Sequence, residues 1–444
     1  MPKNYGNQRD IPSVDFLIEN LDSNSIPRPL LSTLVRDELK KIRKTEKVPS
    51  RSEIIDLLNK KKSDLILSRI KPVINGTGVV IHTNLGRSPI DIPDATGGYL
   101  NLEFDLSNGK RGDRAIYVEK CLAALLDAQA GMFVNNCAAA LMLILKILSP
   151  NKNKVIISRG ELVQIGGGFR LPEILQSTGA ELCEIGTTNQ TTIADYEESI
   201  DSNTGLILKV HRSNFSMDGF VGSPTRKELG LLAKKKRIPL IEDLGSGVLH
   251  SYDCFAEPDL NPKRILKEGV DLVCFSGDKL MGGAQSGVIA GKKRLINSLK
   301  KQPLYRAFRC DKMVLTVMQD VLEKYLNKEV ESLKINKIIT EDLYLLKQRA
   351  QKIVSELNGL KLESNIIPCT STVGGGTSPK AKIKSIALQF SSNKLNAIQI
   401  ATRMRNAELP IIGLIKGGKY CLDLRTIFPE QDKFLLSGIR EIFN

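Results

Sequence analysis

Residues 238–247 read IPLIEDLGSG, and this stretch decides the fold of the chain. Its first four residues are apolar, as in a strand buried on both faces of a parallel sheet, and Asp243 follows close behind them. A second stretch, residues 271–283, reads DLVCFSGDKLMGG and places Lys279 just after another buried strand. Because open α/β sheets bind ligands at the carboxyl ends of their strands, we expect Asp243 and Lys279 to face one ligand.

The rest of the chain fits the same architecture. Short β-branched runs occur at residues 79–81, 155–157, 205–210, 238–241 and 272–275, with helical patterns between them. Buried strands that alternate with helices indicate an α/β domain with a mainly parallel sheet. We expect this large domain to span residues 71–328 and to end in one long helix over 311–328. Residues 329–444 mix helical and strand-like patterns, which predicts a smaller α+β domain.

The N-terminal region, residues 1–70, has a different pattern. Apolar residues recur at helical spacing between Leu30 and Ile42, and Ser50 with Glu53 has the spacing of a capping box. We expect a small helical domain. It carries 14 Lys or Arg against 10 Asp or Glu. This excess fits a solvated helical appendage or dimer arm as well as a nucleic-acid contact.

Composition narrows the class of protein. The hydrophobic share of 41% and the charged share of 25% are those of a soluble globular protein. The net charge of +15 suits contact with a polyanion, although a lysine-rich surface explains it equally well. Eight scattered cysteines have neither zinc-site nor disulfide-framework spacing, so we expect no metal site and a cytoplasmic location. The longest apolar stretch, residues 138–148, is too short to span a bilayer and predicts a buried helix.

Pyridoxal phosphate is the ligand that the strand-end pair suits best. Its aldehyde requires a lysine amine, which Lys279 supplies. Its pyridine nitrogen requires a carboxylate, which Asp243 supplies. Ser276 is a candidate for holding the phosphate. Either Asp243 or Lys279 alone would be explained as a helix cap or a surface loop, but their order on neighbouring strand ends predicts the cofactor.

Other candidates for cofactor contact lie at element boundaries. Asn136 ends a strand-like run and opens an apolar helix, whose first N–H groups are suited to a phosphate, although asparagine also caps purely structural helices. His211 and Asn214 follow the strand at 205–210 and are placed to reach the cofactor ring or the substrate; a core histidine is the alternative for His211. The glycines at 166–168 are typical of a loop that covers a cofactor.

Three arginines are candidates for an anion clamp beyond the cofactor. Arg87 closes the turn-rich segment 75–87, and Arg306 and Arg309 are the other two candidates. Guanidinium groups bind phosphate-like anions in a bidentate manner. Surface salt bridges are the alternative explanation for all three.

Seven segments together resemble the bacterial L-seryl-tRNA(Sec) selenium transferase family, also called selenocysteine synthases. They are residues 11–15, 75–87, 158–170, 186–189, 242–247, 275–283 and 422–426. The resemblance implies a fold type I transferase that uses pyridoxal phosphate and selenophosphate to convert seryl-tRNA(Sec) to selenocysteinyl-tRNA(Sec). It implies Lys279 as the Schiff-base lysine, an N-terminal domain that grips the tRNA, and a homo-oligomeric ring of dimers, usually a decamer. Cys137 stands where the family usually has a third asparagine, and Leu414 where it usually has an arginine.

The chemistry that the resemblance implies is β-elimination of the serine hydroxyl followed by addition of selenium. Lys279 would be the base, Asp278 would assist proton movement, and Arg87, Arg306 and Arg309 would hold selenophosphate. A related lyase or transferase acting on a small amino acid or amino sugar is the main alternative, and it would have little use for the N-terminal domain. A non-enzymatic RNA-binding protein is a second alternative.

Overall fold

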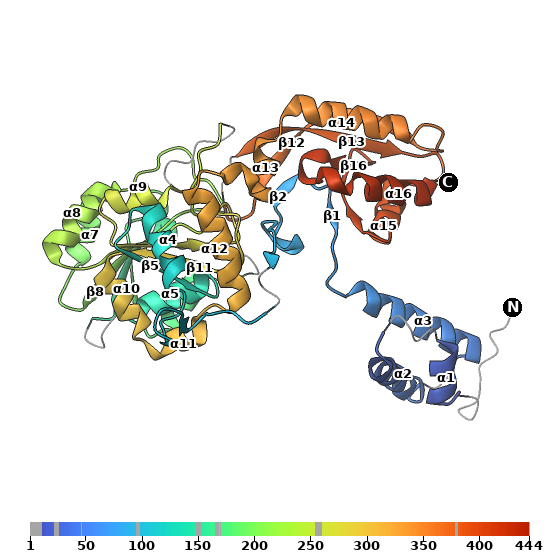
Figure 1. The fold of residues 1–444 in the computed structure, drawn as a ribbon, viewed down its shortest axis with the longest axis horizontal. Helices are drawn as coiled ribbons and strands as arrows, with labels where there is room; N and C mark the ends of the chain where they lie inside the picture. The colour runs from blue at the N-terminus through green and yellow to red at the C-terminus, as the bar shows by residue number, and fades with distance from the viewer. Residues whose placement is uncertain are drawn as a thin grey trace. The chain divides into compact units, whose positions relative to one another are not determined.

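The computed structural model describes residues 11–21, 26–45, 47–94, 98–147, 152–164, 168, 170–253, 260–377 and 381–443. Gly166, Gly167 and Cys254 lie outside these residues. The chain forms two compact units, Met1–Pro72 and Val73–Asn444, close to the boundary expected at residue 70 (Figure 1). The further division into 71–328 and 329–444 stays a prediction. None of the helices described is long and apolar enough to cross a bilayer.

The first unit is a three-helix domain. Its helices are α1 (Val14–Asn20), α2 (Arg28–Ile42) and α3 (Arg51–Leu67). They pack through a small apolar core that includes Leu17, Leu31 and Leu58, each fully buried. Ser50 accepts a hydrogen bond from the Glu53 N–H, and the Glu53 carboxylate accepts one from the Ser50 N–H, so the predicted capping box is confirmed.

The second unit contains a seven-stranded sheet in the order β5-β11-β10-β9-β8-β6-β7. The strands are β5 (Ala130–Val134), β6 (Lys154–Ser158), β7 (Glu181–Ile185), β8 (Thr204–Val210), β9 (Leu240–Asp243), β10 (Leu272–Ser276) and β11 (Gly287–Gly291). Six of them run in one direction, namely β5 and the five strands from β10 across to β7, and β11 is antiparallel to both its neighbours. The mainly parallel sheet and the predicted strands β6, β8, β9 and β10 are therefore confirmed.

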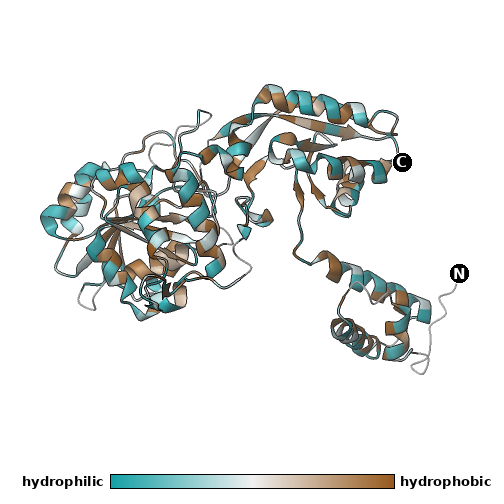
Figure 2. Cartoon of the chain, viewed as in Figure 1, coloured by the Kyte–Doolittle hydropathy of each residue, from teal (hydrophilic) through white to brown (hydrophobic). Residues whose placement is uncertain are grey.

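Helices cover both faces of this sheet. They are α4 (Ile116–Leu126), α5 (Cys137–Leu145), α6 (Leu171–Gln176), α7 (Ile193–Ser199), α8 (Arg226–Lys236), α9 (Pro262–Lys267), α10 (Lys293–Lys300), α11 (Pro303–Phe308) and α12 (Lys312–Leu326). The predicted buried helix is α5, and the predicted long helix is α12, capped by Asp311. Figure 2 shows hydrophobic residues gathered on the strands between these helices.

Alternate strand residues enter two separate cores. Leu240 of β9 packs in the core shared with α4, α8 and α12, whereas Ile241 packs in the core shared with α5, α6 and α10. Because strand side chains alternate between faces, Glu242 shares the face of Leu240 and Asp243 shares the face of Ile241. Asp243 is thereby directed to the face of the sheet that α5 covers.

The C-terminal part of the second unit is built on a five-stranded sheet, in the order β15-β16-β13-β12-β2. The remaining elements are β1 (Ile74–Asn75), β2 (Val79–Ile81), β3 (Phe104–Asp105), β4 (Lys110–Arg111), β12 (Glu363–Gly374), β13 (Lys382–Ser391), β14 (Ile411–Ile412), β15 (Leu414–Lys416), β16 (Lys419–Asp423), α13 (Lys334–Thr340), α14 (Leu343–Glu356), α15 (Ala397–Arg405) and α16 (Asp432–Phe443). This arrangement agrees with the α+β character expected for residues 329–444.

One strand assignment was wrong. Residues 79–81, expected in the large parallel sheet, form β2, which pairs in parallel with β12 of the five-stranded sheet. Likewise β1 pairs with β14. The segment therefore runs along the C-terminal sheet before the chain enters the large one. A three-residue strand has no local pattern that selects its partner, so the pairing is decided by long-range contacts.

Candidate active site

A cavity of about 620 Å³ lies where β8, β9 and β10 end and α5 begins. Its lining includes seven of the predicted residues: Arg87, Asn136, His211, Asn214, Asp243, Ser276 and Lys279. Gly375 and Gly376, in the turn after β12, close another side. The structure therefore brings the strand-end acid and the strand-end lysine into one enclosed space, as expected for an open α/β sheet.

Asp243 is the buried acid of this cavity. Only 8% of its surface is exposed. Its Oδ1 accepts hydrogen bonds from the Gly245 N–H at 2.9 Å and from the Cys137 thiol at 3.4 Å. Burial raises the pKa of the Asp243 carboxyl, and these hydrogen bonds, with the nearby Lys279, oppose that rise. The site thus holds a carboxylate for which a cationic partner, such as a protonated pyridine nitrogen, would be strongly favourable.

Lys279 supplies the amine. It lies in the turn after β10, and its Nζ donates a hydrogen bond to the Gly376 carbonyl at 2.9 Å. Gly376 has a φ of +75°, which strains any other residue, and a Cβ there would lie 2.7 Å from Nζ and displace the amine. Burial lowers the pKa of Lys279, although Cys137 and Asp243 oppose this. A larger share of neutral amine is therefore available than for an exposed lysine.

We expect covalent uptake of pyridoxal phosphate by the cofactor-free protein to speed up with rising pH. The neutral amine is the reactive form, and the lowered pKa of Lys279 places the midpoint of this rise below the ordinary value of 10.5. Stopped-flow absorbance across a pH series would measure it. A midpoint at or above that of free lysine would contradict the burial argument.

The start of α5 forms another wall. The Asn136 side chain accepts a hydrogen bond from the Ala139 N–H at 2.8 Å and so caps α5, which was the structural alternative for this residue. It nevertheless lines the cavity together with the buried Ser276. The helix start, the asparagine and the hydroxyl remain grouped where a phosphate would find N–H and O–H donors.

His211 and Asn214 lie on the loop that leaves β8. The His211 N–H donates to the Asp243 carbonyl at 2.8 Å, which extends the pairing of β8 with β9 and fixes this residue at the cavity edge. Asn214 donates from its side chain to the Gln164 carbonyl across the same cavity. Their contacts to cofactor or substrate stay predictions.

Arg87 and Asp278 form an ion pair that the sequence did not reveal. Arg87 Nη1 lies 2.8 Å from one Asp278 oxygen and 3.1 Å from the other. Both line a hollow of about 260 Å³ beside the main cavity. Asp278 therefore neutralises and orients Arg87, and its expected part in proton movement stays a prediction.

The other two arginines of the expected clamp lie elsewhere. Arg306 is exposed on α11, and Arg309, which caps α11, forms an ion pair with Glu103 at 3.0 Å. Of the described residues that line the cavity, Arg87 is the one arginine. Within this chain the three arginines are therefore not brought to one anion.

Sequence reasoning missed several residues of the cavity. Cys137 was noted only as a departure from a family pattern, yet its sulfur contacts Asp243. Gly376 was not among the expected site residues, yet its carbonyl accepts a hydrogen bond from Lys279. A glycine run is a visible signal, but it does not say which side chain approaches it.

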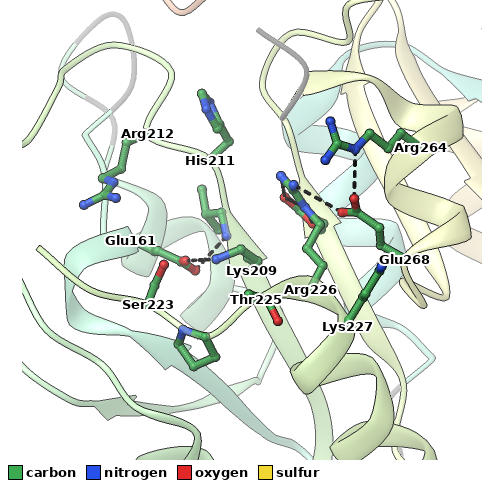
Figure 3. Close-up of a pocket in the computed structure, with 13 residues that line it drawn as sticks. Glu161, Lys209, His211, Arg212, Ser223, Thr225, Arg226, Lys227, Arg264 and Glu268 are labelled. Atoms are coloured by element: carbon green, nitrogen blue, oxygen red, sulfur yellow. Dashed lines mark hydrogen bonds and ion pairs between the residues drawn. The ribbon is translucent and has the colours of Figure 1, made fainter.

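A second cleft, of about 530 Å³, lies on the opposite face of the sheet (Figure 3). Lys209 pairs with Glu161 at 2.6 Å, and Arg226 binds the buried Glu242 at 2.9 Å. Burial raises the pKa of Glu242, and Arg226 opposes this by hydrogen bonds and charge. Val210 and His211 line both cavities, so this charged network supports the strand ends that carry the site.

Replacing Arg226 with methionine is expected to lower the free energy of unfolding by about 3–5 kcal/mol, since Glu242 would keep a buried charge without its partner. Urea unfolding would measure the loss. Arg264→Met is the matched control: the Arg264 side chain is 54% exposed, so losing its ion pair with Glu268 should cost about 1 kcal/mol or less. The double variant R226M/E242L should recover much of the loss. Equal effects of R226M and R264M would refute the argument.

Comparisons with known proteins agree with this site. The chain matches the family described as L-seryl-tRNA selenium transferase (SelA) over residues 73–428. It is 43% identical over 399 residues to the L-seryl-tRNA(Sec) selenium transferase of Clostridium perfringens (strain 13 / Type A), covering 87% of this chain and 85% of that protein. With the enzyme of the same name from Aquifex aeolicus (strain VF5) it is 38% identical over 452 residues, covering 98% and 99%.

Among solved structures, the chain resembles D-glucosaminate-6-phosphate ammonia-lyase. The TM-score is 0.56 at 19% identity, covering 84% of this chain and 96% of that one. This likeness concerns the fold and confirms the predicted fold type I architecture. Taken with the family match and the relatives that span nearly the whole length, it shows that the chain belongs to the L-seryl-tRNA selenium transferase family.

Proposed function

We propose that this protein is a pyridoxal-phosphate enzyme that converts seryl-tRNA(Sec) to selenocysteinyl-tRNA(Sec), with selenophosphate as the selenium donor. The observation that carries the proposal is the enclosed pair of Asp243 and Lys279 in a chain of this family. The relatives' names supply the substrate, and the cavity supplies the groups that the reaction needs.

The residues present fit the cofactor. The cavity holds a lysine amine with a lowered pKa, a buried carboxylate, and a helix start with a hydroxyl for a phosphate. Lys279, Asp243, Ser276, Asn136, His211 and Asn214 would hold it. When bound, pyridoxal phosphate supplies an electron sink for the charge left behind when the seryl Cα proton departs.

The chain's own groups would then divide the work. Lys279 would take the Cα proton, because burial lowers the pKa of its amine and so raises the share that is neutral. Asp243 would hold the proton on the pyridine nitrogen from the buried end of the cavity. The Gly376 carbonyl would receive the Lys279 amine whenever that amine is not covalently engaged.

Arg87 is the proposed contact for selenophosphate. The seryl group arrives as an ester, so no free carboxylate competes for this guanidinium. Asp278 accepts hydrogen bonds from Nη1 of Arg87, which leaves the other nitrogens of this guanidinium to donate to an anion. Arg306 and Arg309 stay proposed selenophosphate ligands on the family resemblance alone, because neither lines this cavity in the described chain.

The helical first unit is the proposed tRNA-binding domain. Its exposed α3 residues Lys60 and Lys61 offer cations for RNA phosphates. The Aquifex relative, which covers 98% of this chain, has a matching region. A homo-oligomeric ring of dimers, a decamer by family resemblance, and a cytoplasmic location are proposed as well.

The double variant K60Q/K61Q is expected to weaken tRNA(Sec) binding. The slope of log binding constant against log salt concentration should become shallower by about two, one for each lost phosphate contact. Gel shifts across a salt series would measure both effects. Lys263→Gln with Lys267→Gln, exposed on α9 of the other unit, is the matched control. Unchanged binding in the first variant would remove α3 from the tRNA contact.

The overall proposal is tested by incubating the purified protein with pyridoxal phosphate, seryl-tRNA(Sec) and selenophosphate, and identifying the aminoacyl group released from the tRNA. Selenocysteine is the expected product. Turnover of a free amino acid or amino sugar without turnover of seryl-tRNA(Sec) would favour the small-molecule lyase. Binding of tRNA without uptake of pyridoxal phosphate would favour a non-enzymatic RNA-binding protein.

A further inference from the structure

Two cysteines flank the buried acid of the cavity. Cys137 is the first residue of α5, and its thiol donates to Asp243 Oδ1 at 3.4 Å. Cys274, fully buried on β10, lies opposite Asp243 in the pairing of β10 with β9. A ligand atom from each of the three residues lies within 4.8 Å of the others. The carboxylate is thus enclosed by sulfur on two sides.

Two donors at hydrogen-bond distance reach one oxygen of this carboxylate, and Cys274 adds a side-chain interaction from β10. The Gly245 N–H and the Cys137 thiol both donate to Oδ1. Among the hydrogen bonds of the described residues, none reaches Oδ2 from a side chain or backbone donor. A carboxylate held through one oxygen has a defined rotation, and its second oxygen remains free to meet a partner in the cavity that Asp243 lines.

The thiol also offsets part of the cost of burial. Burial raises the pKa of Asp243, and the hydrogen bonds from Gly245 and Cys137 lower it. The Cys137 thiol is a weak, uncharged donor. It supports the ionised carboxylate alongside the Gly245 N–H and adds no charge near Lys279. Cys274, which lies opposite Asp243 on β10, also lowers the pKa of the carboxyl through its side chain.

We propose that Cys137 is a positioning residue for Asp243: its thiol sets the rotation of the carboxylate and favours its ionised form, so that the free oxygen receives the pyridine nitrogen of pyridoxal phosphate. This inference rests on the proposed cofactor. An asparagine amide at position 137 could donate the same hydrogen bond to Asp243.

The test is the dissociation constant of pyridoxal phosphate from the full-length protein, measured by fluorescence quenching across a pH series. Cys137→Ala removes the donor and should weaken binding roughly three- to tenfold, the range for one hydrogen bond. It should also move the acid limb of the binding profile to higher pH. Without the donor the pKa of Asp243 rises further, so the carboxylate becomes protonated at a higher pH as acid is added.

Cys137→Asn is the decisive partner variant and should restore both the affinity and the acid limb. Cys121→Ala, which removes a buried thiol on α4 in the other core, should leave both unchanged. Equal losses in C137A and C137N would show that the cysteine only fills space and would overturn the inference. So would a C137A profile identical to that of the unaltered protein.

The two proposals fail in different ways. An unaltered protein that binds pyridoxal phosphate, with C137A showing no change, overturns the role of Cys137 alone. An unaltered protein that takes up no pyridoxal phosphate overturns the proposed function, and the inference falls with it. Loss of selenium transfer with normal cofactor binding leaves the role of Cys137 standing.

Discussion

Replacing Lys279 with alanine is expected to abolish both selenium transfer and the covalent attachment of the cofactor. The amine is the one nucleophile held inside the cavity by the Gly376 carbonyl, and it is also the proposed base. Loss of a general base costs on the order of 10²–10⁴-fold in rate, and loss of the covalent attachment adds to this. Among the described residues that line the cavity, Lys279 is the one lysine, so no second amine is available.

Two measurements follow from this expectation. After borohydride reduction, the unaltered protein should carry one cofactor per chain by mass spectrometry, and the K279A protein none. Lys227→Ala, an exposed lysine at the start of α8, is the matched control and should retain the label. A labelled K279A protein would place the attachment at another amine and would remove the basis of the site.

Replacing Asp243 with asparagine is expected to have the second largest effect. The change keeps the volume but removes the charge that faces the cofactor ring. A neutral amide cannot keep a pyridine nitrogen protonated in a dry site, so the electron sink weakens. Loss of a preorganised electrostatic partner costs on the order of 10²–10³-fold in rate.

The D243N variant also allows a check that is independent of turnover. Its affinity for pyridoxal phosphate should fall, and the acid limb of binding should disappear, because the titrating carboxyl is gone. Asp201→Asn is the control. It removes the ion pair between the half-exposed Asp201 carboxylate and Lys154, and it should change neither the affinity nor the acid limb. Retention of the acid limb in D243N would mean that another group controls cofactor binding.

Local sequence patterns were enough to predict four strands of the large sheet (β6, β8, β9 and β10), the capping box of Ser50 with Glu53, and the placement of Asp243 and Lys279 in one cavity. These features depend on local patterns. A buried strand is a short apolar run, and a ligand-facing residue follows it directly at its carboxyl end. Asp243 is the last residue of β9, Lys279 lies in the turn that follows β10, and β9 and β10 are neighbours, so strand-end reasoning was sufficient.

The tertiary structure alone decided which distant groups meet. Arg87 and Asp278 are 191 residues apart, Lys279 and Gly376 are 97 apart, and Cys137 and Asp243 are 106 apart. Long-range contacts also place β2 in the C-terminal sheet and pair Arg309 with Glu103 in an ion pair. Local sequence specifies an element's type and its buried face, but the choice of partner is made by packing and by burial of charge. That physical difference is why the acid and the lysine could be predicted, whereas the carbonyl, thiol and ion pair around them could not.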